Sequence, residues 1–373
     1  MKKNLSSIIL LIVLLGVFLG GCTSAGVASS WPGLSVADGV AYVTYGAEVY
    51  AVDIKNGNLV WRYPSEPDKA ITYFASPAIA DDVVIVGNYG NGLEAINTKN
   101  GVKKWSFDQA GDRYIGGALI YGGKIYAPNT DSYLYVLDED GSLLWRFRTQ
   151  KANWTTPVTN GDLLFLSSMD HSLYALDLDY PETGLALDEG GTRTLVSEPV
   201  WNADLGAAIF AEPSVGDDGK LFVGTLGGEF YAVNATNGKI LWSFDADGEL
   251  GSVWGPAVIQ EDIVLFGDEK GKIYALSAEN GNEIWPTAYT VDSSIIGGGA
   301  VLPEGIVFPT IGGKLIVINK EGQTLPVISL EGSIYSKPIF VDGKQIIAMI
   351  YSDHLLIALD ENGREYWRFK PEE

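Results

Sequence analysis

The stretch LFVGTLGGEFYAVNATNGKILWSF, Leu221–Phe244, contains the unit from which this chain is built. Two short apolar runs are separated by Gly227-Gly228, and a third run, which contains Trp242, follows Asn237-Gly238. Gly-Gly and Asn-Gly pairs between β-type runs are typical of tight turns. The stretch therefore predicts three short strands joined by tight turns.

Similar text returns eight times along the chain, about 40 to 44 residues apart except for one insertion. The strand before the Asn/Asp turn recurs as Val49–Asp53, Leu93–Asn97, Leu134–Asp138, Leu173–Asp177, Phe230–Asn234, Ile273–Ser277, Leu315–Asn319 and Leu356–Asp360. The tryptophans downstream are Trp61, Trp105, Trp145, Trp201, Trp242, Trp285 and Trp367, and the seventh unit has Pro326 near that place. Each unit also begins with a short strand of the Ser76–Ala80 type, so we expect four strands per unit, named A to D in chain order.

A four-stranded sheet of about 40 residues cannot bury both of its faces alone, whereas sheets stacked around an axis cover one another. The repeats therefore predict an all-β fold, an eight-bladed β-propeller of four-stranded antiparallel blades over residues 31–373. Each tryptophan is expected to dock against the next blade as a structural residue. Because the strand pattern ends near Trp367, blade 8 should come wholly from the C-terminal end and pack against blade 1; a short strand from Gly26–Ser30 that adds to blade 8 is the alternative.

The beginning of the chain reads as an export signal. Lys2 and Lys3 precede an apolar run, and Leu19-Gly20-Gly21-Cys22 resembles the lipobox of bacterial lipoproteins. We expect a signal peptide at 1–21 and a lipidated Cys22 followed by a flexible tether at 22–30; an ordinary cleaved signal with a chance cysteine is the alternative. The chain would then be extracytoplasmic, anchored by lipid to a bacterial cell membrane or outer membrane.

The composition excludes some classes of partner. The 373 residues include 25 Lys and Arg against 47 Asp and Glu, a net charge of −22, which repels phosphate backbones. We therefore expect no nucleic-acid binding. The chain has one Cys, so no intrachain disulfide can form. We expect a monomer that binds one or more envelope proteins and reaches the membrane through its lipid anchor.

The pattern Ala-x-Asp-x-x-x-Gly-x-x-x-Trp, as in Ala51, Asp53, Gly57 and Trp61, resembles the tryptophan-docking repeat of the quinoprotein propellers with PQQ-like repeats. The resemblance covers residues 31–369. Within that superfamily, an eight-bladed lipoprotein of this length is similar to the BamB family of scaffold lipoproteins in outer-membrane β-barrel assembly. The resemblance implies a non-catalytic scaffold that mediates protein–protein interaction in the cell envelope.

The same superfamily contains dehydrogenases that carry pyrroloquinoline quinone (PQQ). The resemblance implies that such an enzyme needs adjacent cysteines, Ca²⁺ ligands and an Asp base, but the single Cys here is Cys22. His171 and His354 belong to blades on opposite sides of the ring and cannot share a metal. We therefore predict no catalytic, cofactor-binding or metal site, with a PQQ–calcium or other small-ligand-binding propeller, possibly a quinoprotein dehydrogenase, as the alternative.

One further pattern precedes the A strands. In each unit, the position three residues before the one equivalent to Pro77 mostly carries an apolar or aromatic side chain. Because the A strands line the axis, these side chains give a candidate binding ring at one mouth of the channel. Its members are Trp31, Phe74, Trp154, Phe210, Trp254 (beside Val253) and Tyr335. Glu212 and Lys337 are the charged residues nearby. The ring either seals the channel and packs the loops, or forms a funnel for a peptide or small planar ligand.

The fourth unit carries the one long insertion, between Leu178 and Pro199. Its glycines and acidic residues favour a mobile loop over a docking finger.

Overall fold

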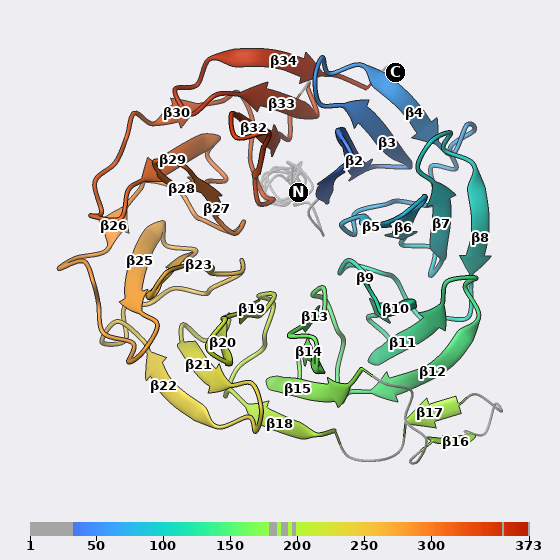
Figure 1. Cartoon of the computed structure of the whole chain (residues 1–373), viewed down its shortest axis with the longest axis horizontal. Coiled ribbons are helices and arrows are strands. Elements are labelled where there is room, and N and C mark those ends of the chain that lie inside the picture. Colours follow the sequence, from blue (N-terminus) through green and yellow to red (C-terminus); the bar gives the residue numbers. More distant parts are fainter. Residues whose placement is uncertain (1–32, 179–184, 188–192, 196–198, 353, 372–373) are drawn as a thin grey trace, which may run out of the picture. The chain divides into compact units, whose positions relative to one another are not determined.

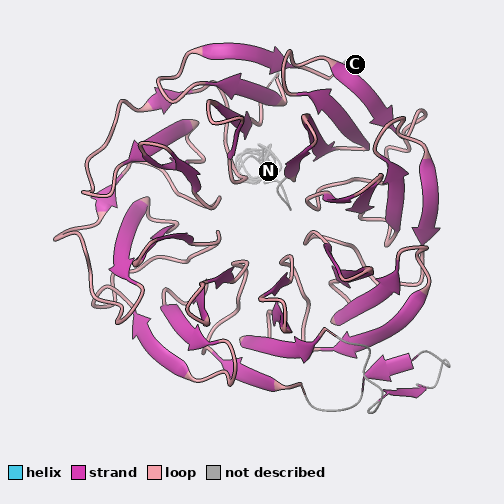
Figure 2. Cartoon of the chain, in the orientation of Figure 1, coloured by secondary structure: helices cyan, strands magenta, loops and turns pink. Residues whose placement is uncertain are grey.

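The computed structural model describes residues 33–178, 185–187, 193–195, 199–352 and 354–371, all within the compact unit Pro32–Glu373. The strands of this unit form eight sheets that follow one another around a central axis as the blades of a propeller (Figure 1). The described part is built of strands and loops without helices (Figure 2). It accordingly holds no helix long and apolar enough to span a membrane. The predicted all-β, eight-bladed fold is confirmed.

The strands run in chain order from the inside of each blade to its outside. Blade 1 holds β1 (Leu34–Ala37), β2 (Val40–Tyr45), β3 (Glu48–Asp53) and β4 (Leu59–Tyr63); blade 2 holds β5 (Ala78–Ala80), β6 (Val83–Gly87), β7 (Leu93–Asn97) and β8 (Lys103–Phe107). Blade 3 holds β9 (Leu119–Tyr121), β10 (Lys124–Pro128), β11 (Tyr133–Asp138) and β12 (Leu143–Arg148); blade 4 holds β13 (Val158–Thr159), β14 (Leu163–Ser167), β15 (Ser172–Asp177) and β18 (Trp201–Asp204).

The second half repeats this order. Blade 5 holds β19 (Ser214–Val215), β20 (Lys220–Gly224), β21 (Phe230–Asn234) and β22 (Ile240–Phe244); blade 6 holds β23 (Val258–Gln260), β24 (Ile263–Gly267), β25 (Lys272–Ser277) and β26 (Tyr289–Thr290). Blade 7 holds β27 (Ala300–Leu302), β28 (Gly305–Pro309), β29 (Lys314–Ile318) and β30 (Ile328–Ser329); blade 8 holds β31 (Ile339–Val341), β32 (Gln345–Met349), β33 (Leu356–Leu359) and β34 (Glu365–Phe369).

Each blade is an antiparallel meander whose turns follow from its sequence. In blade 5 the turn between β21 and β22 places Gly238 at φ 72°, a conformation that glycine adopts without steric cost. The register then shifts between Ala232 and Val233, which brings Trp242 opposite Ala232. A bulge of this kind increases the local twist, so it helps the outer strand wrap toward the neighbouring blade.

The hydrophobic core lies between the blades. Between blades 5 and 6, for example, the rings of Phe230 and Phe266 stack with their centroids 3.9 Å apart, and Phe222 and Tyr274 are buried in the same cluster. Another cluster joins blades 8 and 1 through Trp367, Leu356 and the blade 1 residues around them. A single blade would expose these side chains, so each sheet depends on its neighbours for burial.

Most of the repeat tryptophans, in or just before the outer strand, reach the turn of the next blade. Trp61 Nε1 donates a hydrogen bond to Thr98 O at 2.7 Å, and a Cβ on Gly101 would lie 2.9 Å from Trp61 Cδ2. The same type of bond joins Trp105 to Glu139 O, Trp201 to Ala235 O, Trp242 to Ala278 O and Trp285 to Lys320 O. The outer strand of blade 7 has no tryptophan, and Ile328 of this strand lies against Gly363 in the turn of blade 8.

Blade 3 has two extra strands, which come from the insertion in blade 4. β16 (Leu185–Leu187) pairs antiparallel with β17 (Arg193–Leu195), and β17 pairs parallel with β12. The expected mobile loop is therefore wrong for these segments, because the edge of β12 offers unpaired backbone groups that a strand can satisfy. Residues 179–184, 188–192 and 196–198 of the insertion lie outside the described residues.

Candidate functional site at the channel mouth

One face of the propeller carries two kinds of loop: the B–C loop within each blade and the D–A segment that enters the next blade. The D–A segment before β5 is hydrogen-bonded to both neighbouring blades, because Tyr73 N donates to Gly46 O at 2.7 Å and Tyr89 N donates to Thr72 O at 2.9 Å. The equivalent donor–acceptor pairs to the preceding blade are Tyr114–Asn88, Asn153–Asn129, Ile209–Ser168, Val253–Thr225, Ile295–Asp268 and Ile334–Thr310. These backbone bonds hold the segments before the inner strands in fixed positions.

Burial alternates along these segments. Before β19, Ile209, Ala211 and Pro213 are buried, while Phe210 and Glu212 are half-buried. Residues two apart on an extended chain point to the same side. Because the segment lies at the inner end of its blade, the side that is not packed between blades faces the channel mouth, and it carries Phe210 and Glu212.

Three of the predicted ring residues contact one another in sequence around the mouth. The rings of Trp154 and Phe210 meet edge to face with centroids 4.7 Å apart, and Phe210 and Trp254 are 5.2 Å apart. They come from the segments entering blades 4, 5 and 6 and are half-buried. We call these three residues the aromatic arc.

The strand register explains why Trp254, rather than Val253, takes part in the arc. Val258 of β23 pairs with Leu265, the third residue of β24, as Ser214 of β19 pairs with Phe222, the third residue of β20. Trp254 is therefore equivalent to Phe210, and Val253 occupies the fully buried position before it. Counting back from Pro256 in the sequence misplaces blade 6 by one residue.

The other predicted members lie elsewhere on the same rim. The ring centroids of Phe74 and Tyr89 are 5.3 Å apart, and those of Tyr335 and Tyr351 are 6.4 Å apart. Trp31 and Cys22 lie outside the described residues. Sequence reasoning missed the aromatic residues of the B–C loops, among them Tyr89 and Tyr351. A tyrosine at the beginning of the B–C loop could have indicated them. The B–C loops do not follow the repeat pattern, so an alignment of the repeats does not reveal these residues.

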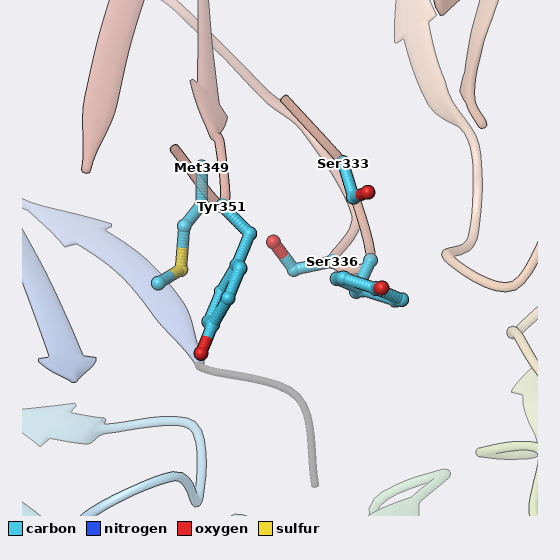
Figure 3. Close-up of a pocket in the computed structure, with 5 residues that line it drawn as sticks. Ser333, Ser336, Met349 and Tyr351 are labelled. Carbon is cyan, nitrogen blue, oxygen red and sulfur yellow. The ribbon is translucent and has the colours of Figure 1, made fainter. Parts of the chain in front are cut away.

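A small hollow lies beside Tyr335 at blade 8. Met349 and Tyr351 border it on one side, and Ser333 and Ser336 of the segment before β31 border it on the other (Figure 3). Ser336 Oγ is buried without a hydrogen-bond partner in the described part of the chain. The hollow is almost wholly apolar, so it adds apolar surface to the rim rather than a catalytic group.

Below the aromatic rim, the residue two positions after each rim position, as Glu212 follows Phe210, belongs to a second layer. A Cβ on Gly33 would lie 2.2 Å from Ser76 Cα, and a Cβ on Gly298 would lie 2.7 Å from Pro256 Cγ, so neighbouring positions touch. The eight equivalent residues are Gly33, Ser76, Gly117, Thr156, Glu212, Pro256, Gly298 and Lys337. We call them the inner layer; only Glu212 and Lys337 in it are ionisable.

The two charged residues of the inner layer differ in their surroundings. Burial raises the pKa of the Glu212 carboxyl to about 7, and the Lys337 ammonium opposes this by lowering it. Lys337 is exposed, whereas Glu212 is half-buried below the aromatic arc. Glu212 is thus a carboxyl that is poorly solvated and forms no salt bridge within the described residues.

The ionisable metal donors do not cluster in the described part of the chain. Among them no three His, Cys, Asp or Glu side chains come together as a possible metal site. His171 lies in the loop before β15 and His354 in the loop before β33, in blades 4 and 8. With one Cys in the chain, the adjacent cysteines implied for a quinoprotein dehydrogenase are absent, so the residues do not fit this group.

The family model described as outer membrane protein assembly factor BamB matches residues 23–138, 115–184, 195–291, 251–329 and 269–373. The chain belongs to this family.

Individual relatives of two kinds are similar to the chain. It is 22% identical over 204 residues to the outer membrane protein assembly factor BamB of Yersinia pestis, across 53% of this chain and 48% of that protein. It is 31% identical over 137 residues to the quinohemoprotein alcohol dehydrogenase ADH-IIG of Pseudomonas putida, across 31% of this chain and 19% of that protein. The matches thus span less than half the length of these curated relatives.

Solved structures show the same fold. The crystal structure of BamB from Moraxella catarrhalis matches with a TM-score of 0.66 and 16% identity, covering 85% of this chain and 90% of that one. The computationally designed Ika8 protein matches with a TM-score of 0.72 and 15% identity, covering 89% of this chain and 96% of that one. A designed protein shares the architecture as fully as a natural one does, so function has to be argued from the site.

Proposed function

We propose that this protein is a non-catalytic, lipid-anchored scaffold outside the cytoplasm that binds a partner protein of the cell envelope through its D–A and B–C loop face. Membership of the BamB family supports the envelope setting. The observation that carries the binding role is the aromatic arc. Trp154, Phe210 and Trp254 are half-buried aromatic residues on a rim held by backbone hydrogen bonds.

The physical reason lies in what rigid aromatic residues do at interfaces. They offer a large contact area and lose little conformational entropy on binding, so they are enriched among the residues that dominate affinity. A rim whose backbone is already ordered also loses less entropy than a free loop when a partner docks. The arc therefore suits protein recognition better than it suits catalysis, which would need converging reactive groups.

The alternative is a propeller that binds PQQ or another small ligand, possibly as a dehydrogenase. One observation favours it, because quinoprotein alcohol dehydrogenases are among the similar proteins, including PedH of Pseudomonas putida at 26% identity over 215 residues. Against it stands the donor set, since Cys22 is the only cysteine of the chain. Quinone absorbance and dye-linked alcohol oxidation after addition of PQQ and Ca²⁺ would support the alternative.

Site-specific crosslinking in the native envelope tests the scaffold role. A photo-reactive phenylalanine analogue replaces Tyr351, which is 47% exposed on the loop face, or Tyr121, which is 40% exposed at the turn between β9 and β10 on the opposite face. We expect a discrete protein adduct from position 351 and none from position 121. Phe210→Ser and Trp154→Ser should weaken the adduct at 351 while the folded fraction stays unchanged. Equal adducts from both faces, or none from either, would contradict the proposal.

A further inference from the structure

Glu212 is the only acidic side chain among the eight residues of the inner layer. Its seven counterparts are glycine, serine, threonine, proline or, in blade 8, Lys337. A packing role would be served by the small residues found in the other blades. Glutamate at this one position therefore calls for a reason other than closure of the ring.

The aromatic arc is centred on the same segment. Phe210 lies two residues before Glu212 on the same side of the chain, and Trp154 and Trp254 contact Phe210 from the two neighbouring blades. Aromatic rings attract cations over their faces, and a carboxylate below them adds a charged acceptor. Blades 4, 5 and 6 thus combine both elements of a site for an organic cation.

The charge of the molecule points to the same kind of ligand. The net charge of −22 raises the local concentration of cations at a mouth lined by low-dielectric walls. An uncharged planar ligand on the arc would bury the Glu212 carboxylate further without a partner, which is costly. A basic group would instead pair with it.

We propose that the aromatic arc and Glu212 bind a basic side chain, lysine or arginine, that a partner protein inserts into the channel mouth. This rests on the scaffold function proposed above and specifies the chemistry of its partner. The ammonium or guanidinium lies against the faces of the arc and donates hydrogen bonds to the Glu212 carboxylate. Lys337, on blade 8, repels the same cation and so directs it toward blades 4 to 6.

The test uses the mature chain and terminally blocked, fluorescently labelled tetralysine and tetraarginine peptides, with tetraglutamine and tetraglutamate as controls, and measures fluorescence anisotropy. Glu212→Gln keeps the shape and removes the charge, and it should weaken tetralysine binding by about tenfold or more, as for loss of a charged hydrogen-bond acceptor. Glu304→Gln removes the same charge from an exposed turn on the opposite face and should change affinity by less than about twofold. Lys337→Gln should strengthen binding.

The aromatic contribution is tested with a second matched pair. Phe210→Ser should weaken binding of both basic peptides, whereas Tyr121→Ser on the opposite face should leave it unchanged. Thermal unfolding of each variant, followed by circular dichroism, shows whether the fold is kept, and Glu212→Gln decides the question if Phe210→Ser fails to fold. Equal weakening by Glu212→Gln and Glu304→Gln, or equal affinity of parent and Glu212→Gln, would overturn the inference.

The outcome separates this inference from the proposed function. If the position 351 adduct persists in Glu212→Gln and its peptide affinity equals that of the parent, the scaffold role stands and the cation site is wrong. If basic peptides bind in a Glu212-dependent way but no envelope adduct forms, the cation site stands and the scaffold role is wrong.

Discussion

The indole Nε1 of Trp367 donates a 2.7 Å hydrogen bond to the carbonyl oxygen of Ile54, 313 residues earlier in the chain. Trp367 belongs to β34 of blade 8, and Ile54 follows β3 of blade 1. The same indole covers Gly57, where a Cβ would lie 2.7 Å from Trp367 Cε3. Blades 8 and 1 therefore meet through the same contact that joins Trp61 to blade 2, and this contact closes the ring.

Trp367→Ala should lower the free energy of unfolding by about 3–5 kcal/mol, because it leaves a cavity between the first and last blades. Trp61→Ala is the matched variant within the ring and should cost a similar amount. Urea denaturation followed by circular dichroism measures both. A Trp367→Ala variant within about 1 kcal/mol of the parent would show that the closure does not depend on this side chain.

Trp145 differs from the other docking tryptophans, because its buried Nε1 has no hydrogen-bond partner among the described residues. Trp145→Phe therefore loses no hydrogen bond to a described residue, whereas Trp61→Phe loses the bond to Thr98 O. We expect Trp61→Phe to be the more destabilising variant by about 1 kcal/mol in urea denaturation. Equal losses would mean that the Trp61 bond contributes nothing.

Gly57→Ala tests the close approach of blade 8 to the first turn. Gly57 has φ 72° and Trp367 directly above it, while Gly39 has φ 78° and nothing within 4 Å of an added Cβ. Gly39→Ala should cost about 1 kcal/mol from backbone strain alone. Gly57→Ala should cost at least about 2 kcal/mol, since strain and overpacking add. Thermal unfolding compares the pair, and a smaller loss at Gly57 would contradict this explanation.

The pH dependence of stability reports on Glu212. Its pKa is raised from 4.5 to about 7 in the folded protein, so the folded state holds this proton more tightly than the unfolded state. The resulting stabilisation is fully present below about pH 4.5 and is lost as the pH rises to about 7. Glu212→Gln has no such loss.

Relative to the parent, Glu212→Gln should therefore gain stability between about pH 4.5 and 7 and keep a constant advantage above that range. The half-buried position limits the advantage to about 1–2 kcal/mol. Glu304→Gln serves as the control and should show no such pH-dependent difference from the parent. Denaturation curves at pH 4, 6 and 8 measure the free energy of unfolding of each variant. Parallel pH profiles for Glu212→Gln and the parent would contradict the raised pKa of Glu212.

Lipidation of Cys22 remains a prediction from the sequence. Cys22→Ser should abolish incorporation of a labelled fatty acid and move the protein from the membrane fraction to the soluble fraction, because two or more acyl chains are needed for stable anchoring. Ser24→Ala, two residues away, is the control. A Cys22→Ser protein that stays in the membrane fraction and still carries the label would contradict a lipid anchor at this cysteine.

Much of the fold could be predicted from the sequence because the turn residues recur at the same place in most repeats. Gly57, Gly101 and Gly238 occur at the same place in their units, and all three have positive φ in the structure. The inner ends of the blades were harder to predict. In blade 6, Pro256 takes the place that Glu212 holds in blade 5, and only strand pairing reveals this offset of one residue.

The insertion and the site mark the limits of sequence reasoning. Nothing in the local sequence of 193–195 indicates a parallel partner, because β17 joins β12 of another blade. The aromatic residues before the A strands could be found by alignment, but their neighbours Tyr89 and Tyr351 come from loops without the repeat. Which aromatic rings touch depends on the angle between blades, which no single repeat contains.

The sequence alone determined the number of blades, the strands within each blade and the positions of the docking tryptophans, because these follow from hydrophobic periodicity and turn residues that act within about 40 residues. Only the tertiary structure decided which residues meet across blades: Trp367 with Ile54, β17 with β12, and Trp154 with Phe210 and Trp254. These contacts join segments that are distant in the chain, and their geometry arises only when eight sheets share one closed ring.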